Sequence, residues 1–203
     1  MPPRSYDSSI RRAAAADKRR RLVEAAGLLL REKTNIAAFS LEAVARMAGV
    51  TRLTVYNQFG SRRGLLEAVF DERAHQGGLE RIGQAMAMAD ASAALDRLIG
   101  IFCDFWGSDP AIGLLHEAIA IDPEFAQAVT ERNERRRGAV GTLLRRIVPQ
   151  AADDEARAEA VDLIFTLTGY ATFHSLRRDR TTQAACTILQ DACHAAVERL
   201  RGR

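Results

Sequence analysis

The chain has 203 residues, of which 47% are hydrophobic and 27% are charged, so it can bury a core in one domain or two small ones. The longest stretch without Asp, Glu, Lys or Arg is Leu163–Leu176, 14 residues, whereas a membrane-spanning helix needs about 20. We therefore expect neither a transmembrane protein nor, without an apolar core near the basic N-terminus, a secreted one.

Positive charge is concentrated in the N-terminal part of the chain. Residues 1–75 carry 14 Lys and Arg against 8 Asp and Glu, while residues 76–203 carry 15 against 18. This asymmetry indicates an anionic partner for the first part alone. The three cysteines, Cys103, Cys186 and Cys193, cannot make a closed disulfide framework, and we expect a reducing, cytoplasmic location.

The pattern of apolar residues predicts helices almost throughout, because no segment alternates with the period of a strand. Residues 1–16 are expected to form a loose basic arm, and Asp17 is expected to cap a first helix that runs to about Lys33. Ser40, Thr51 and Ser61 each precede a further helix. Five longer helices follow, bounded by Pro, Gly or polar residues: Ala91–Trp106, Ala111–Ile121, Glu124–Val148, Asp154–Arg178 and Thr182–Arg201.

The segment Leu41–Phe59 has the spacing of a helix-turn-helix. Two short helices that pack closely need a small residue at their contact, a glycine in the turn and an apolar residue inside the second helix. Ala45, Gly49 and Val55 supply these in that order. An ordinary core hairpin fits the same three positions, but it has no need of a polar outward face. The second helix presents such a face with Thr51, Arg52, Thr54, Asn57 and Gln58.

Residues 19–70 resemble the DNA-binding domain of the TetR/AcrR family of transcription regulators. The shared features are the paired alanines Ala25 and Ala26, the turn Gly49-Val50-Thr51, Tyr56, Phe59, and Ser61-Arg62 at the start of a fourth helix. The resemblance implies an all-α fold with two parts. Residues 1–80 would hold a three-helix helix-turn-helix domain that binds DNA, and residues 81–203 a helical bundle that binds an effector and dimerises.

The expected DNA contacts lie on the second helix of the motif and at the starts of its neighbours. Such a helix reaches base edges with its N-terminal residues, where Arg52 can donate two hydrogen bonds to guanine or, alternatively, bind a phosphate. Leu53 either touches a thymine methyl group or only packs, and the resemblance implies that Tyr56 gives its hydroxyl to a phosphate. The full expected set is Ser40, Thr51, Arg52, Leu53, Thr54, Tyr56, Asn57, Gln58, Ser61 and Arg62.

The resemblance further implies an apolar effector pocket in the C-terminal part, although each aromatic side chain there is also an ordinary core candidate. The expected lining is Phe102, Phe105, Trp106, His116, Phe165 and Thr168. The nearby run of Arg132, Arg135, Arg136 and Arg137 is expected to be a solvated face balanced by glutamates.

Small and apolar residues recur at three- and four-residue steps on the last two helices, and small residues allow close helix approach. A monomer buries one such stripe, whereas two indicate a four-helix dimer interface, as in the resembling family. The expected interface residues are Ala171, Ser175, Ala185, Leu189, Ala192 and Ala196.

Two other functions share part of this pattern. Glu72 and His75 have the spacing of a di-iron ligand pair, but the class needs a second such motif, and Asp191 with His194 is only a near match. An architectural DNA-binding protein shares the helix-turn-helix but has no need of residues 81–203. We therefore expect a non-enzymatic homodimeric repressor, without metal or other cofactor, that a small molecule releases from a palindromic DNA operator.

Overall fold

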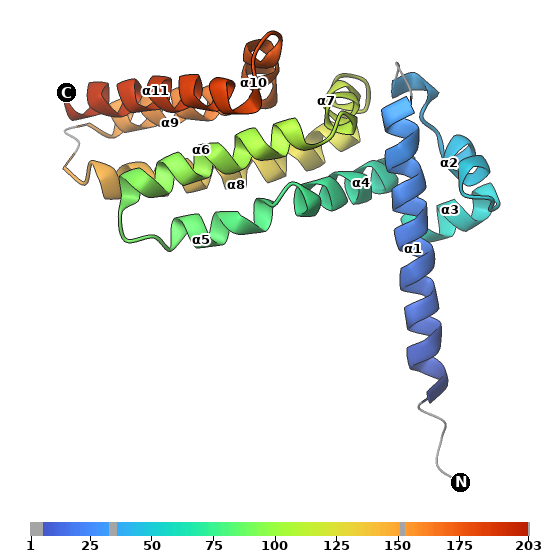
Figure 1. The fold of residues 1–203 in the computed structure, drawn as a ribbon. Coiled ribbons are helices and arrows are strands. Elements are labelled where there is room, and N and C mark those ends of the chain that lie inside the picture. The colour runs from blue at the N-terminus through green and yellow to red at the C-terminus, as the bar shows by residue number, and fades with distance from the viewer. Residues whose placement is uncertain (1–5, 33–35, 151–152, 203) are drawn as a thin grey trace. The chain divides into compact units, whose positions relative to one another are not determined.

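The structure is a computed structural model that describes residues 6–32, 36–150 and 153–202. Across these ranges every regular element is a helix and there is no strand (Figure 1). The α-helices are α1 (Tyr6–Glu32), α2 (Leu41–Met47), α3 (Arg52–Phe59), α4 (Arg62–Gln76), α5 (Ile82–Met86), α6 (Ala91–Ser108), α7 (Ala111–Ile121), α8 (Pro123–Ile147), α9 (Asp154–Leu167), α10 (Tyr170–Arg177) and α11 (Thr182–Arg201). Two 3₁₀ turns, η1 (Ile36–Ala38) and η2 (Leu79–Arg81), complete the described elements.

The all-α prediction is confirmed, but the start of the first helix was wrong. Helix α1 begins at Tyr6, so residues 6–16 are not a loose arm, and Asp17 lies inside the helix rather than at its cap. Alanine has the highest helix propensity of any residue type, so Ala13–Ala16 favour a helix that continues through them. Asp17 forms ion pairs with Arg20 and Arg21, one turn later in the same helix. Residues 1–5 and Lys33 lie outside the described residues.

The helix expected over Asp154–Arg178 is also wrong, because it is divided into α9 and α10. The break falls at Thr168 and Gly169. The Thr168 hydroxyl donates to the carbonyl of Ile164 at 2.8 Å, and Gly169 begins α10 with extended backbone. Side-chain hydrogen bonds of this kind compete with the main-chain ladder and end a helix locally.

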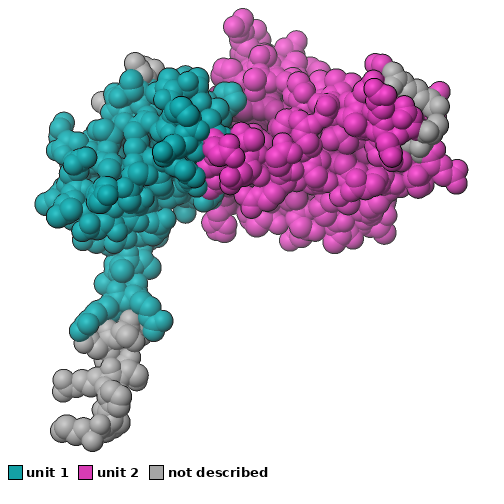
Figure 2. Space-filling model, turned by 180° about the vertical axis from the view of Figure 1, so that it is seen from behind, with its two compact units in different colours: residues 1–72, 110–126 teal, residues 73–109, 127–203 magenta. Residues whose placement is uncertain are grey.

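The chain divides into two compact units, coloured separately in Figure 2: Met1–Glu72 with Pro110–Ala126 (unit 1) and Arg73–Asp109 with Gln127–Arg203 (unit 2). In unit 1, α1 packs against α2 and α7. Its core is made of apolar side chains that recur every three or four residues on α1 and α4 and are joined by those of the short helices: Leu22, Ala26, Leu29, Leu30, Val44, Ala45, Val55, Leu65, Leu66 and Val69.

In unit 2, α11 packs against both α6 and α9, and apolar side chains of α8 join the same cluster (Figure 1). Their inward faces form one apolar cluster that includes Leu98, Phe102, Leu143, Ile164 and Leu189. Cys103, Cys186 and Cys193 are buried and free. This cluster stabilises the unit through the apolar area that it removes from water.

The unit boundaries differ from the expected division at residue 80, because Pro110–Ala126 lies with the N-terminal residues. Whether function divides in the same way stays a prediction. In the part of the chain that the structure describes, no single helix has the length and hydropathy to span a membrane. The bent pair Ala91–Ser108 and Ala111–Ile121, taken together, has the length and composition that a span requires.

Candidate DNA-binding and effector sites

The helix-turn-helix is formed by α2, a tight turn and α3. Ser40 caps α2, with its hydroxyl accepting a hydrogen bond from the amide of Ala43 at 3.1 Å. Gly49 ends the first helix with a φ of +65°, a conformation that costs other residues steric strain. Thr51 caps α3, with its hydroxyl accepting from the amide of Thr54 at 3.2 Å. These caps fix where each helix begins and therefore which side chains α3 presents.

The outward face of α3 carries the predicted reading side chains. Arg52 and Asn57 are exposed, and the exposed fractions of Leu53 and Tyr56 are 65% and 50%. Val55 is fully buried and anchors the opposite face of the helix. An exposed leucine and tyrosine beside polar residues on so short a helix are typical of a surface that binds a partner rather than of a core hairpin. Their contacts with DNA stay a prediction.

Three of the predicted hydroxyl contacts have a structural role in the helix starts. Ser40 and Thr51 are helix caps, and the Ser61 hydroxyl accepts from the amide of Gly64 at 3.0 Å in the first turn of α4. A capped helix N-terminus keeps further main-chain N–H groups directed outward, and these groups attract phosphate oxygens. The caps and the expected phosphate contacts are therefore compatible.

Arg19 on α1 holds the end of α3, which the sequence analysis did not anticipate. Its guanidinium donates to the carbonyl of Gln58 at 2.9 Å and lies 4.5 Å from the centre of the Phe59 ring. The contact joins residues 39 positions apart in the chain. It fixes the C-terminal end of the helix whose N-terminal end carries Arg52.

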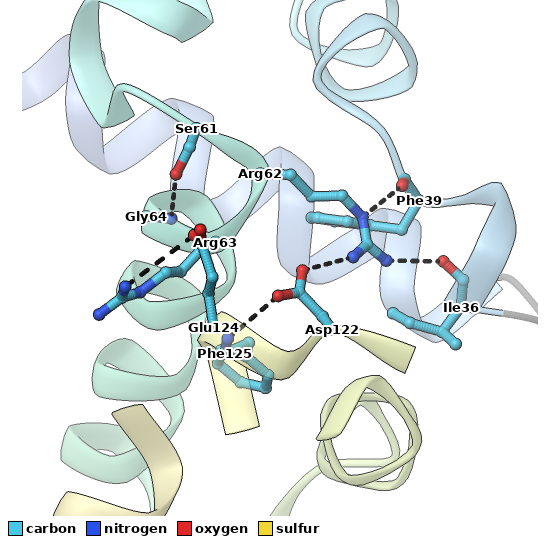
Figure 3. Close-up of polar contacts among 9 residues, drawn as sticks. All are labelled: Ile36, Phe39, Ser61, Arg62, Arg63, Gly64, Asp122, Glu124 and Phe125. Carbon is cyan, nitrogen blue, oxygen red and sulfur yellow. Dashed lines mark hydrogen bonds and ion pairs between the residues drawn. The ribbon is translucent and has the colours of Figure 1, made fainter. Parts of the chain in front are cut away.

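Arg62 connects three segments of unit 1 (Figure 3). Its Nε donates to the carbonyl of Phe39 at 3.1 Å and its Nη2 to the carbonyl of Ile36 at 3.2 Å. Its Nη1 pairs with a carboxylate oxygen of Asp122 at 2.8 Å. The other Asp122 oxygen accepts from the amide of Phe125 at 3.0 Å and so caps the first turn of α8. Arg62 thus ties α4 to η1, to the start of α2 and to the turn between α7 and α8.

This geometry gives Arg62 a structural role within unit 1, and its expected contact with DNA stays a prediction. All three nitrogens of its guanidinium donate to acceptors within the unit, and its side chain is largely covered. Its neighbour Arg63 contacts Glu67 at 2.7 Å. Figure 3 shows its second acidic neighbour, Glu124, at 4.0 Å. Neither the Asp122 partner nor the two carbonyl partners are identifiable from the local sequence, because they lie 23 to 60 residues away.

Five of the six predicted effector-site residues come together in unit 2. The Trp106 ring lies 4.6 Å from that of Phe105 and 6.5 Å from that of Phe102, and its indole N–H donates to the carbonyl of Thr168 at 3.0 Å. Phe165 joins them through Arg136, which contacts both Phe165 and Thr168. The sixth residue, His116, belongs to unit 1 and is exposed, and its place in an effector site stays a prediction.

The environment of Arg136 differs most from the one that the sequence predicts. It was expected on a solvated face, yet only 9% of it is exposed. Its Nη1 donates to the carbonyl of Phe165 and to the hydroxyl of Thr168, each at 3.0 Å. Its guanidinium carbon lies 4.0 Å from the centre of the Phe165 ring and 5.5 Å from that of Phe102. Burial, with a smaller contribution from the charge of Arg137, lowers the pKa of Arg136 to about 10, so it stays charged at neutral pH.

Two residues of the predicted dimer stripe, Ala185 and Leu189, are fully buried in the core of unit 2 and do not reach its surface. Ala196 is 5% exposed and lines a surface groove together with Leu163, so its place in an interface stays a prediction. Ala171 and Ser175 are exposed, and Ala192 is half-buried. The large apolar side chains that α9 and α11 do expose are Leu163 and Ile188, at 42% and 38%. Small residues pack equally well within a protomer and between protomers, so the spacing of the stripe does not distinguish the two.

Comparison with known proteins decides what the helix-turn-helix belongs to. Residues 21–69, which span α1 to α4, match the model of the bacterial regulatory proteins of the tetR family. The chain is also 29% identical, over 84% of its own length and 76% of the relative's, to the HTH-type transcriptional regulator EthR of Mycolicibacterium smegmatis. Residues 21–69 therefore carry the domain of the tetR family. The α2–turn–α3 geometry described above lies inside this matched segment.

Solved structures share the fold over most of the chain. A transcriptional regulator from Saccharomonospora viridis in complex with choline has a TM-score of 0.66 at 16% identity, covering 87% of this chain and 95% of its own. The multidrug binding protein EbrR, complexed with imidazole, has a TM-score of 0.58 at 20% identity, covering 87% and 89%. Proteins of the TetR family are transcriptional regulators, so the prediction that this chain is a DNA-binding regulator and not an enzyme is confirmed.

Proposed function

We propose that this TetR-family regulator is a repressor that binds a palindromic operator as a homodimer and leaves it when a small molecule binds unit 2. The observation that supports DNA binding is the outward face of α3, which is fixed at both ends of the helix. Its first turn is capped by Thr51, its far end is held by Arg19, and Arg52, Tyr56 and Asn57 project from it.

The effector-binding half is supported by the side chains gathered in unit 2. Phe102, Phe105, Trp106 and Phe165 bring aromatic rings close together, and Arg136 and Thr168 add polar groups beside them. Mostly apolar walls with a few placed polar groups are the usual composition of small-molecule sites. The structures with choline and imidazole belong to regulators of the same fold, which also favours a ligand-binding role.

Coupling between the two activities requires an element that both can influence. Helix α4 is continuous from Arg62, where it contacts η1 and the start of α2, to Arg73, which forms a buried ion pair with Asp109 at 2.9 Å. An effector releases DNA only if it binds the DNA-incompetent state more tightly. Allosteric couplings of about 1–3 kcal/mol change affinity about 5–150-fold, which is enough to empty an operator.

The test is a pair of titrations on the full chain. Fluorescence anisotropy measures its affinity for DNA fragments that flank its own gene and for a random fragment, and thermal melting identifies compounds that stabilise the protein. Compounds found in this way should weaken specific binding at least fivefold. Compounds that bind unit 2 yet leave operator affinity unchanged would show a ligand-independent DNA-binding protein, and equal affinity for both fragments would contradict operator recognition itself.

A further inference from the structure

The guanidinium of Arg136 has one edge in use and one edge without a protein acceptor. An arginine carries five N–H donors, and only those of Nη1 are engaged, by Phe165 and Thr168. The Nε–H is buried without a hydrogen-bond acceptor, and no bond from Nη2 reaches any part of the chain that the structure describes. Nε and Nη2 form the side of the guanidinium that binds a carboxylate through two parallel hydrogen bonds.

The charge of Arg136 is not balanced by a protein carboxylate. Its polar contacts are a carbonyl and a hydroxyl at the end of α9, and no ion pair joins it to an acidic residue in the described ranges. The neighbouring Arg137, by contrast, pairs with Glu134 and Asp162. The carbonyls at a helix C-terminus carry only partial negative charge, so they hold the cation without neutralising it. A buried cation of this kind attracts an anion from outside the chain.

We propose, on the basis of the effector-binding function above, that Arg136 is the charge-recognising residue of that site and that the effector is a small carboxylate with an apolar body. The Nε–Nη2 edge receives the two carboxylate oxygens, and the rings of Phe102 and Phe165 flank the guanidinium. A phosphate fits less well, because one arginine among aromatic rings leaves its additional oxygens and charge unsatisfied.

Burial of the Nε–H makes carboxylate binding a conformational event. The atom is covered by the surrounding side chains, so a carboxylate reaches it only after the packing around Arg136 changes. Arg136 holds the carbonyl of Phe165 and the hydroxyl of Thr168 where α9 ends and α10 begins. A ligand that reorients Arg136 therefore acts on the break between these helices, and it favours the state in which that break has changed.

Isothermal titration calorimetry on the full chain tests the charge requirement with matched probes. Octanoate and phenylacetate are compared with octanamide and phenylacetamide, which keep the shape and lose the charge, and with choline as a cation. We expect each carboxylate to bind at least tenfold more tightly than its amide. Amides that bind as tightly as the acids, tighter binding of choline, or no binding of either acid at millimolar concentration would each overturn the proposal.

Substitutions locate the requirement at Arg136. In Arg136→Gln the preference for carboxylates over amides should disappear, and in Arg136→Lys it should be reduced, because lysine keeps the charge and lacks the two-pronged edge. Arg135→Gln is the matched control, since it removes the same charge from the exposed residue one position earlier on α8, and it should keep the full preference. If circular dichroism shows that Arg136→Gln does not fold, the lysine variant and the acid–amide pairs measured on the wild type still test whether Arg136 recognises the carboxylate.

Operator binding separates this proposal from the function on which it rests. Carboxylates that bind through Arg136 but leave operator affinity unchanged would uphold the site and contradict effector release. Amides or choline that release the operator while the acids do not would contradict the role of Arg136 and leave the repressor function standing.

Discussion

At the scale of single residues, three arginines have different roles because different segments of the folded chain surround them. Arg52 is exposed on α3, Arg62 is tied to three segments of unit 1, and Arg136 is buried among aromatic rings. An exposed guanidinium interacts with external anions, whereas one held by fixed acceptors stabilises the fold. Substitutions at these positions should therefore affect different measurements.

Arg52→Ala should weaken operator binding without changing stability. We expect a loss of about 1–3 kcal/mol in specific binding and relaxed preference at one base, because a bidentate contact to guanine is lost. The unfolding free energy should stay within about 0.5 kcal/mol of the wild type, as for other exposed positions. Anisotropy with operator variants and urea denaturation measure the two effects. An equal loss on random DNA would instead assign Arg52 to a phosphate.

Arg62→Ala should chiefly destabilise unit 1. It removes a largely covered ion pair to Asp122 and two hydrogen bonds to carbonyls, for which we expect a loss of about 1–3 kcal/mol in unfolding free energy. Urea denaturation of Arg62→Ala, Asp122→Ala and the double variant gives the coupling between the two side chains. A coupling energy near zero, with lower affinity for all DNA sequences, would restore the phosphate role.

At the scale of elements, the starts and ends of helices decide which faces are presented. Ser40, Thr51 and Asp122 cap α2, α3 and α8, and Gly49 and Gly60 adopt positive φ where α2 and α3 end. Capping residues and glycines satisfy or release the unpaired main-chain groups of helix ends. The turn from α3 into α4 contains only Gly60 and Ser61.

Gly64→Ala tests that junction. A Cβ at Gly64 would lie 2.1 Å from the carbonyl oxygen of Phe59, a main-chain atom that cannot move without displacing the end of α3. We expect an overpacking cost of about 1–3 kcal/mol and weaker operator binding. Gly138→Ala, in the open middle of α8, is the control and should instead stabilise by about 0.5–1 kcal/mol. Thermal melting that ranks the two variants in the opposite order would contradict the crowding at α3.

At the scale of the whole molecule, a palindromic site requires two recognition helices. In helix-turn-helix dimers the half-sites lie about 34–36 Å apart, one helical turn of DNA. A surface for pairing on unit 2 is offered by α9 and α11, which expose Leu163 and Ile188. Leu163 also lines a groove of about 160 Å³ between the two helices, together with Ala196 and Leu200. Regulators of this family act as dimers, and for this chain that face is our proposed interface.

Ile188→Glu should convert the dimer to a monomer at micromolar concentration. The substitution buries a charge at the proposed interface, and in a twofold dimer it does so twice. Ile121→Glu is the control, because it places the same charge on an exposed isoleucine of α7 and should leave assembly unchanged. Light scattering measures the mass of each variant. A wild type that is monomeric under these conditions would falsify the dimer.

Ala192→Glu, at a half-buried position on the same helix, distinguishes the two candidate faces of α11. If the interface follows Ile188 rather than the small-residue stripe, Ala192→Glu should weaken the dimer less than Ile188→Glu does. The same light-scattering measurement ranks the two variants. A larger effect at Ala192 would return the interface to the stripe.

The sequence by itself determined the features that depend on near neighbours in the chain. The spacing of Ala45, Gly49 and Val55, together with caps at Ser40 and Thr51, specifies the helix-turn-helix, because each contact spans about one or two helical turns. The same reasoning gave the all-α class and the bounds of α7 and α11.

Only the tertiary structure decided which side chains of a helix meet distant partners. Arg136 lies one and two helical turns before Val140 and Leu143 on the buried face of α8, but a run of four charged residues predicted a solvated surface. Its partners Phe102 on α6 and Phe165 on α9 lie 34 and 29 residues away along the chain. The partners of Arg62 on η1 and before α8 lie 26 and 60 residues away. Local periodicity specifies a helix and its faces, whereas the identity of what covers each face depends on contacts between segments that only the folded chain brings together.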